Sequence, residues 1–302
     1  MRHIAIIGAG EIGQAIKQLF GKQPMIFWDN DPKKIKHKKS LETVLTDARM
    51  VFLCMPTRGL PSVLPTTAAT VSTAAPIISV SKGIELKSRL FVDELLAVSL
   101  PKHSTALLYG PMLAEEIMAN RGAVGVLAAK NKKIYQLLHT MITVSTFRLE
   151  YSTDVHGVAV VGVLKNIYSF ALGIADGLRW GHNMRCWLIQ ASLREMEQLV
   201  KIFNGRRDTV YTAAGLGDLI ATGMSDQSHN FTVGQQLARG GTCAFSNEGC
   251  VALPIIVKQL GTQIKKFPLL HTLYKITVSD NAPSIFQQLL KKSLIVPAYA
   301  TC

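Results

Sequence analysis

The chain has 302 residues, more than one hydrophobic core usually organises, so two domains are expected. Hydrophobic residues make up 48% of the chain and charged residues 18%, which excludes the composition typical of a disordered protein. The net charge of +13 favours anionic ligands, but it names no partner by itself.

The first apolar run, residues 4–7, ends at Gly8 and is too short for the core of a signal peptide, so we expect a buried strand. The first half of the chain then alternates short aliphatic runs with helix-like stretches, which is typical of βα units and a parallel sheet. We predict strands at residues 3–7, 25–28, 50–54, 77–80, 106–109, 123–128 and 146–149. After Tyr151 long apolar-periodic segments, at 155–203, 233–238 and 250–260, predict helices. We therefore expect an α/β domain at residues 1–151 and an all-α domain at residues 152–302.

A glycine-rich turn follows the first predicted strand. Gly8, Gly10 and Gly13 form a GxGxxG motif between this strand and the next helix. In such a motif the first glycine makes the turn, the second admits a pyrophosphate and the third permits helix packing, while the helix N-terminus attracts the phosphates. The alternative is a turn that binds nothing, but an acidic residue at the end of the second strand, Asp29, favours a dinucleotide.

The residues around this turn bear on the choice of cofactor. Asp29 would accept hydrogen bonds from the ribose hydroxyls and repel a 2′-phosphate, which favours NAD(H), while nearby lysines leave NADP(H) open. Glu11 is unusual because its carboxylate would point toward the pyrophosphate unless it faces solvent or caps the helix, as we expect. The basic run at residues 33–39 has no interleaved aromatic residues, so we expect a solvated surface and no specific nucleic-acid partner.

Two further features bear on location. Residues 157–178 are apolar enough to suggest a membrane span, but Lys165 lies within this run, where a charge costs about 2.5 to 3.5 kcal/mol. We therefore expect a buried helix. The cysteines form no CxxC pair and no cluster with zinc spacing, and their odd number fits poorly with a disulfide framework, so we expect reduced thiols, no metal and a cytoplasmic protein. They are Cys54, Cys186, Cys243, Cys250 and Cys302.

Seven sequence blocks, in chain order, resemble one family. They read GAGEIGQAI from Gly8, SVSKGIE from Ser79, YGPMLAEEI from Tyr109, GVLKNIYSFALGIADGL from Gly162, GLGDLIATG from Gly215, DQSHN from Asp226 and NEG from Asn247. Through them the chain resembles the NAD(P)-dependent glycerol-3-phosphate dehydrogenases. The resemblance implies a Rossmann domain with a doubly wound parallel sheet, followed by an all-α domain like the C-terminal domain of 6-phosphogluconate dehydrogenase. It also implies a phosphorylated small-molecule substrate and a role in phospholipid synthesis. Members of the family are often dimers, so the resemblance leaves a homodimer open beside a monomer.

The GxLKN block implies the catalytic group. Reduction of a ketone needs a hydride, which the nicotinamide delivers, and a proton for the oxygen, a role suited to a buried lysine. Lys165 lies among apolar neighbours, where a lysine needs a partner or a ligand; a snorkelling lysine is the alternative. The resemblance makes Lys165 the proton donor and acceptor and gives Asn166 to the substrate.

The remaining blocks imply further site residues. Asp218 and Thr222 are four residues apart and share a face if this segment is helical. The resemblance has Asp218 orient the catalytic lysine, although it could instead cap a helix, and it puts Thr222 at the substrate. It places Lys82 at the cleft, near both nicotinamide and substrate. It further implies Gly110, Ser228, His229 and Asn230 at the substrate, and Ile12, Ala114, His229 and Glu248 at the cofactor.

The chain departs from the family pattern at two positions. The family expects arginine where His229 stands, and arginine is a permanently charged, bidentate anchor for phosphate, whereas histidine offers at most two donors. The bacterial members usually carry a small hydroxyl residue where Met112 stands. These departures leave two rivals open, a related reductase of another hydroxy or keto substrate and an NAD(H)-binding sensor with little turnover. Nucleic-acid binding driven by the net charge is a third, and would be strongly salt-dependent.

Overall fold

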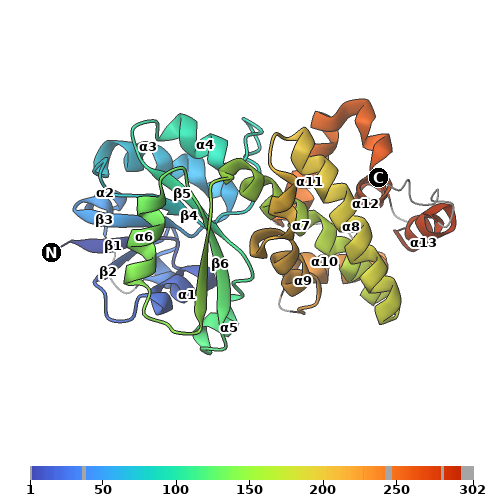
Figure 1. Ribbon diagram of the computed structural model, residues 1–302, viewed down its shortest axis with the longest axis horizontal. Coiled ribbons are helices and arrows are strands. Elements are labelled where there is room, and N and C mark those ends of the chain that lie inside the picture. The colour runs from blue at the N-terminus through green and yellow to red at the C-terminus, as the bar shows by residue number, and fades with distance from the viewer. Residues whose placement is uncertain (1, 36–38, 227, 242–246, 280–281, 294–302) are drawn as a thin grey trace. The chain divides into compact units, whose positions relative to one another are not determined.

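The computed structural model describes residues 2–35, 39–226, 228–241, 247–279 and 282–293 (Figure 1). The chain divides into two compact units. The first comprises Met1–Val163 and Val200–Asp218, and the second comprises Leu164–Leu199 and Leu219–Cys302. This division falls inside a long helix rather than after Tyr151. The first turns of that helix belong with the sheet because a Cβ on Gly162 would lie 2.6 Å from the ring of Tyr109. The boundary after Tyr151 stays a prediction.

The first unit is built on one sheet of seven strands. They are β1 (His3–Ile7), β2 (Met25–Trp28), β3 (Ala48–Leu53), β4 (Ile77–Ser79), β5 (Thr105–Tyr109), β6 (Ala123–Ala128) and β7 (Phe147–Ser152). The strand order is β2-β1-β3-β4-β5-β6-β7, and neighbours are parallel except for β5 and β6. All seven predicted strands are present. From β1 the chain runs to β2 on one side and then returns to β3 on the other side of β1. The strand order therefore reverses between β1 and β3. Sheets of this kind bind ligands at the carboxyl ends of the strands at such a switch point.

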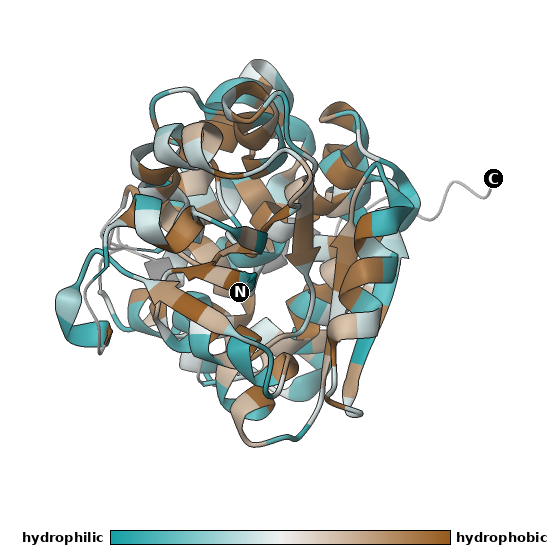
Figure 2. Cartoon of the chain, turned by 90° about the vertical axis from the view of Figure 1, so that its left-hand side faces the viewer, coloured by the Kyte–Doolittle hydropathy of each residue, from teal (hydrophilic) through white to brown (hydrophobic). Residues whose placement is uncertain are grey.

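Helices lie on both sides of this sheet (Figure 1). They are α1 (Glu11–Leu19), α2 (Leu41–Leu45), α3 (Leu60–Thr70), α4 (Val92–Ser99), α5 (Ala114–Met118) and α6 (Lys132–Met141). All five residues of β1 are buried, as expected for a central parallel strand that is covered on two faces. On one face Ile4 and Ile6 pack in a core with Phe20 and Phe52, whose ring centroids are 5.5 Å apart. Figure 2 shows the hydrophobic strands inside and hydrophilic residues on the outer helices. The unit is a doubly wound, Rossmann-type sheet.

The second unit is helical. Its helices are α7 (Val155–Gly177), whose first turns belong to the first unit, α8 (His182–Ile202), α9 (Asp218–Gly223), α10 (His229–Ala238), α11 (Glu248–Leu260), α12 (Pro268–Thr277) and α13 (Ala282–Ser293). The predicted helical segment at 155–203 is therefore two helices. Glycines bring α7 and α10 together, because a Cβ on Gly173 would lie 2.1 Å from the carbonyl oxygen of Phe231 and one on Gly234 would lie 2.4 Å from that of Phe170.

Helix α7 is long and apolar enough to cross a membrane, but its apolar stretch is completely buried. This agrees with the expected core helix. The cysteines differ in part from expectation. Cys54 is buried, Cys186 is exposed and both are free, whereas Cys250 is disulfide-bonded. The expectation of reduced thiols is therefore wrong for Cys250. An odd number of cysteines excludes a framework in which every cysteine is paired, but it does not exclude a single disulfide. Cys243 and Cys302 lie outside the described residues.

A buried carboxylate joins three helices of the second unit. Glu195 of α8 accepts hydrogen bonds from Tyr168 Oη of α7 at 2.7 Å and from the backbone N–H groups of Leu269 and Leu270 in α12 at 2.7 and 2.9 Å. Burial raises the pKa of Glu195 to about 7, and the three donors oppose this rise. Since the folded chain holds this proton more tightly than the unfolded chain, we infer that the protonated form stabilises the fold.

This carboxylate predicts how stability depends on pH. The contribution of Glu195 is fully present below its ordinary pKa of 4.5 and is lost as the pH rises through about 7. Its size is on the order of 3 kcal/mol. We expect the unfolding midpoint of the wild type to fall relative to that of Glu195→Gln between about pH 5 and pH 8, because glutamine does not titrate; circular dichroism measures both midpoints. The exposed Glu42→Gln serves as control, and parallel curves for wild type and Glu195→Gln would contradict this interpretation.

Candidate active site

The glycine-rich turn lies at the switch point, between the end of β1 and α1. Gly8 has φ of +107°, and a Cβ there would lie 2.2 Å from the carbonyl oxygen of Cys54. A Cβ on Gly13 would lie 2.1 Å from the carbonyl oxygen of Gly8, so α1 packs directly against the turn. Gly10 differs from both, because a Cβ there would meet nothing within 4 Å. Protein packing therefore does not require glycine at position 10, whereas close approach of a ligand would.

A pocket of about 750 Å³ opens beside Gly10. It is lined by Ala9, Gly10, Glu11, Gln14, Lys34, Ala114, Glu115, Met118 and Ala119. The predicted cofactor residues Glu11 and Ala114 thus meet at one pocket. Glu11 is the exposed first residue of α1; it faces solvent, and no side chain caps this helix. Ile12 is half-buried beside it.

Asp29 follows β2 and contacts the glycine-rich turn. Its Oδ2 accepts a hydrogen bond from the backbone N–H of Ala9 at 2.8 Å, and its Oδ1 accepts one from that of Asp31 at 2.9 Å. A carboxylate has about four lone-pair sites, so it retains capacity for further donors such as ribose hydroxyls. The contact also fixes the turn against β2.

Lys82, after β4, is held by oxygen atoms from two other segments. Its Nζ lies 2.5 Å from Asp218 Oδ2 and donates to the carbonyl oxygen of Gly110 at 3.1 Å. Gly110 has φ of +143°, and a Cβ there would lie 2.3 Å from the carbonyl oxygen of Val124, so only glycine fits. Asp218 is 3% exposed. This ion pair joins two positions that the sequence indicates separately, since nothing local to either marks the other as its partner.

Lys165 and Asn166 project from α7 into the second unit. Lys165 is 6% exposed and its Nζ donates to Thr222 Oγ1 at 2.9 Å. Asn166 Oδ1 accepts from Asn230 Nδ2 at 2.9 Å. The close packing of α7 on α10 explains why these asparagines meet. The pairing of Asp218 with Lys165 stays a prediction.

The first turn of α10 carries the predicted anion-binding residues. Ser228 caps this helix, its Oγ accepting from the backbone N–H of Phe231 at 3.3 Å. His229 is the exposed first residue of α10. Among the described residues, the Oδ1 atom of Asn230 is buried without a hydrogen-bond partner. A buried orphan acceptor of this kind fits a site that receives a donor from a ligand.

Two other predicted positions belong to the start of α11, which packs against α7 since a Cβ on Gly249 would lie 2.8 Å from the carbonyl oxygen of Asn166, and to the segment after Gly110. Glu248 is the half-buried first residue of α11, whose cap Asn247 accepts from the N–H of Gly249 at 2.9 Å. Met112, seen as a departure at the substrate, is 8% exposed and belongs to the core of the sheet unit. Its thioether packs there, 3.4 Å from the position that a Cβ on Gly125 would take. Among the described residues no three His, Cys, Asp or Glu side chains form a group that could hold a metal ion.

A doubly wound sheet with an open glycine turn at its switch point defines the class of a Rossmann-type protein whose turn suits a dinucleotide. Both halves of the chain are similar to one known family. Residues 30–135 match the NAD-dependent glycerol-3-phosphate dehydrogenase N-terminus, and residues 154–287 match the C-terminus of the same family. The chain belongs to the NAD-dependent glycerol-3-phosphate dehydrogenase family.

Individual relatives agree with this assignment. Glycerol-3-phosphate dehydrogenase [NAD(P)+] 2 of Sphingopyxis alaskensis is 32% identical, covering 87% of this chain and 81% of the relative. The glycerol-3-phosphate dehydrogenase [NAD(P)+] of Agrobacterium fabrum is also 32% identical, covering 78% of this chain and 80% of the relative. The crystal structure of glycerol-3-phosphate dehydrogenase from Coxiella burnetii is similar with a TM-score of 0.86 at 27% identity, covering 98% of this chain and 99% of that one.

Proposed function

We propose that this protein is an NAD(P)-dependent glycerol-3-phosphate dehydrogenase that interconverts sn-glycerol 3-phosphate and dihydroxyacetone phosphate. The observation that carries the proposal is a buried lysine, Lys165, held by Thr222 on the helix that begins with Asp218, in a chain whose other unit has the open glycine turn. When bound, the nicotinamide supplies or accepts the hydride at the substrate carbon. The protein must supply the proton at the oxygen.

Lys165 is the group assigned to this proton. Its Nζ donates to the substrate oxygen during reduction and recovers the proton during oxidation, so it acts as general acid and base. Thr222 Oγ1 orients the Nζ atom. The resemblance also assigns Lys82 to the substrate, and Asp218 and the Gly110 carbonyl hold its positive charge in one geometry. A fixed cation of this kind stabilises negative charge that develops on an oxygen.

The phosphate of the substrate is assigned to the start of α10. A helix N-terminus attracts anions through its dipole and backbone N–H groups. His229 and Asn230 lie in this first turn, and the orphan Asn230 Oδ1 is matched to a hydroxyl donor of the substrate. With histidine in place of the arginine that the resemblance expects, phosphate is bound with fewer charged contacts. A related reductase with less need for phosphate is the second candidate that this observation favours.

Substrate profiling tests the function and separates the candidates. We expect purified protein to oxidise NADH or NADPH with dihydroxyacetone phosphate faster than with dihydroxyacetone, which has no phosphate. Faster turnover of an unphosphorylated ketone would favour the second candidate. Cofactor binding without turnover of any ketone would favour an NAD(H) sensor.

Gly10 tests the cofactor assignment. A methyl group there meets no protein atom within 4 Å but would occupy the space through which the pyrophosphate approaches the backbone. We expect Gly10→Ala to weaken NADH binding about tenfold, since overpacking costs typically 1 to 3 kcal/mol, with an unchanged unfolding midpoint. Fluorescence titration measures the affinity. Gly181→Ala, another glycine with open space, is the control, and equal affinity of both variants would refute the assignment.

Asp29 tests the choice between the two cofactors. Its negative charge disfavours the 2′-phosphate of NADPH, although Lys34 lines the same pocket as the turn. We propose NAD(H) as the preferred cofactor. Asp29→Asn retains an acceptor for the Ala9 N–H but loses the charge, so the ratio of kcat/KM for NADPH to that for NADH should rise on the order of tenfold. A ratio that stays constant would show that Asp29 does not select the cofactor.

We further propose that the chain works in the cytoplasm, which its free cysteines Cys54 and Cys186 favour. The change of sequence pattern after Tyr151 supports a domain boundary there, and the resemblance supports a homodimer. Light scattering coupled to gel filtration tests the dimer, with a mass of one chain, 33.0 kDa, as the result against it.

A further inference from the structure

Asp154 lies between the end of β7 and the first residue of α7. Its Oδ1 accepts a hydrogen bond from the backbone N–H of Gly157 at 3.1 Å, and its own N–H donates to Ser152 Oγ at 3.1 Å. An aspartate that accepts from the third residue of a helix is a helix cap. Asp154 therefore fixes the start of α7, the helix on which Lys165 lies about three turns further on.

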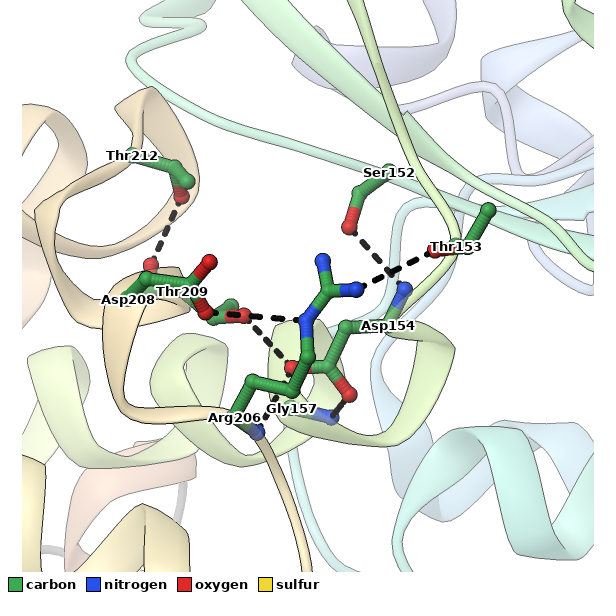
Figure 3. Close-up of polar contacts among 8 residues, drawn as sticks. All are labelled: Ser152, Thr153, Asp154, Gly157, Arg206, Asp208, Thr209 and Thr212. Atoms are coloured by element: carbon green, nitrogen blue, oxygen red, sulfur yellow. Dashed lines mark hydrogen bonds and ion pairs between the residues drawn. The ribbon is translucent and has the colours of Figure 1, made fainter.

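The second carboxylate oxygen of Asp154 binds a distant segment of the same unit. Oδ2 accepts from the backbone N–H of Arg206 at 2.9 Å and from Thr209 Oγ1 at 2.5 Å. Figure 3 shows both donors converging on Asp154, opposite the N–H of Gly157. They belong to the turn after α8 and to the short helix Arg207–Tyr211. One side chain thus joins two segments about fifty residues apart in the sequence.

The backbones of these two segments touch. A Cβ on Gly205 would lie 2.6 Å from the Cα atom of Gly157, and a Cβ on Gly157 would lie 1.8 Å from Asp154 Oδ2. The Asp154 carboxylate occupies the space beside Gly157. A side chain at Gly157 or at Gly205 would therefore displace the carboxylate or the neighbouring backbone.

The charged side chains around this contact add little. Arg206 reaches Thr153 Oγ1 at 3.3 Å and Asp208 Oδ1 at 3.5 Å, and the side chains of Arg206 and Asp208 are 57% and 77% exposed. Exposed ion pairs of this kind contribute little to stability. The hydrogen bonds to Asp154 are therefore the specific link between the segments.

Hydrogen bonds continue from this link to Asp218. Thr212 Oγ1 donates to the carbonyl oxygen of Thr209 at 2.7 Å. The carbonyl oxygen of Thr212 accepts from the N–H groups of Gly215 at 3.1 Å and Gly217 at 3.3 Å. The next residue is Asp218. A short bonded segment, residues 206–217, thus connects the Asp154 carboxylate to the residue that pairs with Lys82.

We propose that Asp154 is a positioning residue that, through residues 206–217, holds Asp218 in place for its ion pair with Lys82. The inference rests on the proposed function, in which this pair serves catalysis. Asp154 touches no reacting atom. Its loss would misplace Asp218 while the side chains of the site stay intact, and small displacements of catalytic groups lower rates by about 100-fold.

Asp154→Ser tests the proposal. Serine is a good helix cap, so the start of α7 is retained, but its single short hydroxyl replaces both carboxylate oxygens and the bridge to Arg206 and Thr209 is lost. We expect faster amide hydrogen exchange in residues 206–217 with unchanged exchange at the start of α7. We also expect kcat to fall about 10- to 100-fold while the affinity for NADH, measured by fluorescence, stays unchanged. Thr209→Val should give the same changes to a smaller degree, and Asp208→Asn should give none.

Two outcomes would overturn the proposal. One is unchanged exchange in residues 206–217 of Asp154→Ser. The other is faster exchange with an unchanged kcat, which would reduce Asp154 to a structural role. If the wild type turns over no ketone, that result contradicts the proposed function and leaves the role of Asp154 to be decided by hydrogen exchange alone. Faster exchange in residues 206–217 of Asp154→Ser would then still show that Asp154 holds the segment that leads to Asp218.

Discussion

Replacing Lys165 by alanine is expected to lower kcat for reduction of dihydroxyacetone phosphate about a thousandfold. The proposed general acid would be lost, and a positioned acid or base contributes typically 10²- to 10⁴-fold. The affinity for NADH should be unchanged, because the glycine turn and its pocket belong to the first unit. Steady-state oxidation of NADH measures the rate, and fluorescence titration measures the affinity.

Two controls make this result specific. Lys165 is buried, so alanine leaves a cavity that could destabilise the second unit. Lys165→Met, which is similar in length and has no proton to give, separates loss of chemistry from loss of packing. Lys201→Ala removes an exposed lysine and should leave kcat unaltered. A Lys165→Met enzyme with more than about a tenth of the wild-type kcat would argue against the role of Lys165 as acid and base.

Replacing His229 by arginine should strengthen substrate binding. A guanidinium forms charge-assisted, bidentate hydrogen bonds to phosphate, and one hydrogen bond to a charged group is worth roughly 1.5 to 3 kcal/mol. We expect the KM for dihydroxyacetone phosphate to fall about 10- to 100-fold, with a small change in kcat. Initial rates across a range of substrate concentrations measure both constants.

The matched substrate for this test is dihydroxyacetone, which lacks the phosphate. Its KM should be the same in the wild type and in His229→Arg, because the new charge has no phosphate to bind. An equal fall for both substrates would show a general electrostatic effect of the added charge. A KM for dihydroxyacetone phosphate that does not fall would mean that the start of α10 does not bind the phosphate, and would favour the second candidate function.

The sequence predicts the sheet of this protein well, and for a physical reason. Buried parallel strands are short continuous runs of aliphatic residues. The motif marks the switch point because Gly8 and Gly13 allow the tight turn and helix packing, while Gly10 leaves open space for a ligand. The predicted cofactor residues Glu11 and Ala114 line one pocket. These features depend on local patterns, which a single sequence displays.

Features that depend on long-range contacts were harder to predict. The pair of Lys82 and Asp218 joins residues far apart in the chain, and nothing local to either marks the partner. The break between α7 and α8 is a local feature by contrast: Gly177 and Gly181 flank it and Arg179 has φ of +58°, but the long apolar pattern on either side obscures this turn. Met112 was interpreted from the family pattern as a substrate position, but its thioether packs in the core of the sheet unit. The sequence analysis does not single out Asp154, because only the structure shows its carboxylate bound to Arg206 and Thr209.

The most direct test of the proposed function is identification of the product. Purified protein is incubated with NADH and dihydroxyacetone phosphate, and the products are quantified by nuclear magnetic resonance, with Lys165→Met as control. The proposal predicts glycerol 3-phosphate in a one-to-one ratio with oxidised cofactor, and none with the variant. No glycerol 3-phosphate with either NADH or NADPH at millimolar substrate, from protein that binds the cofactor, would contradict it.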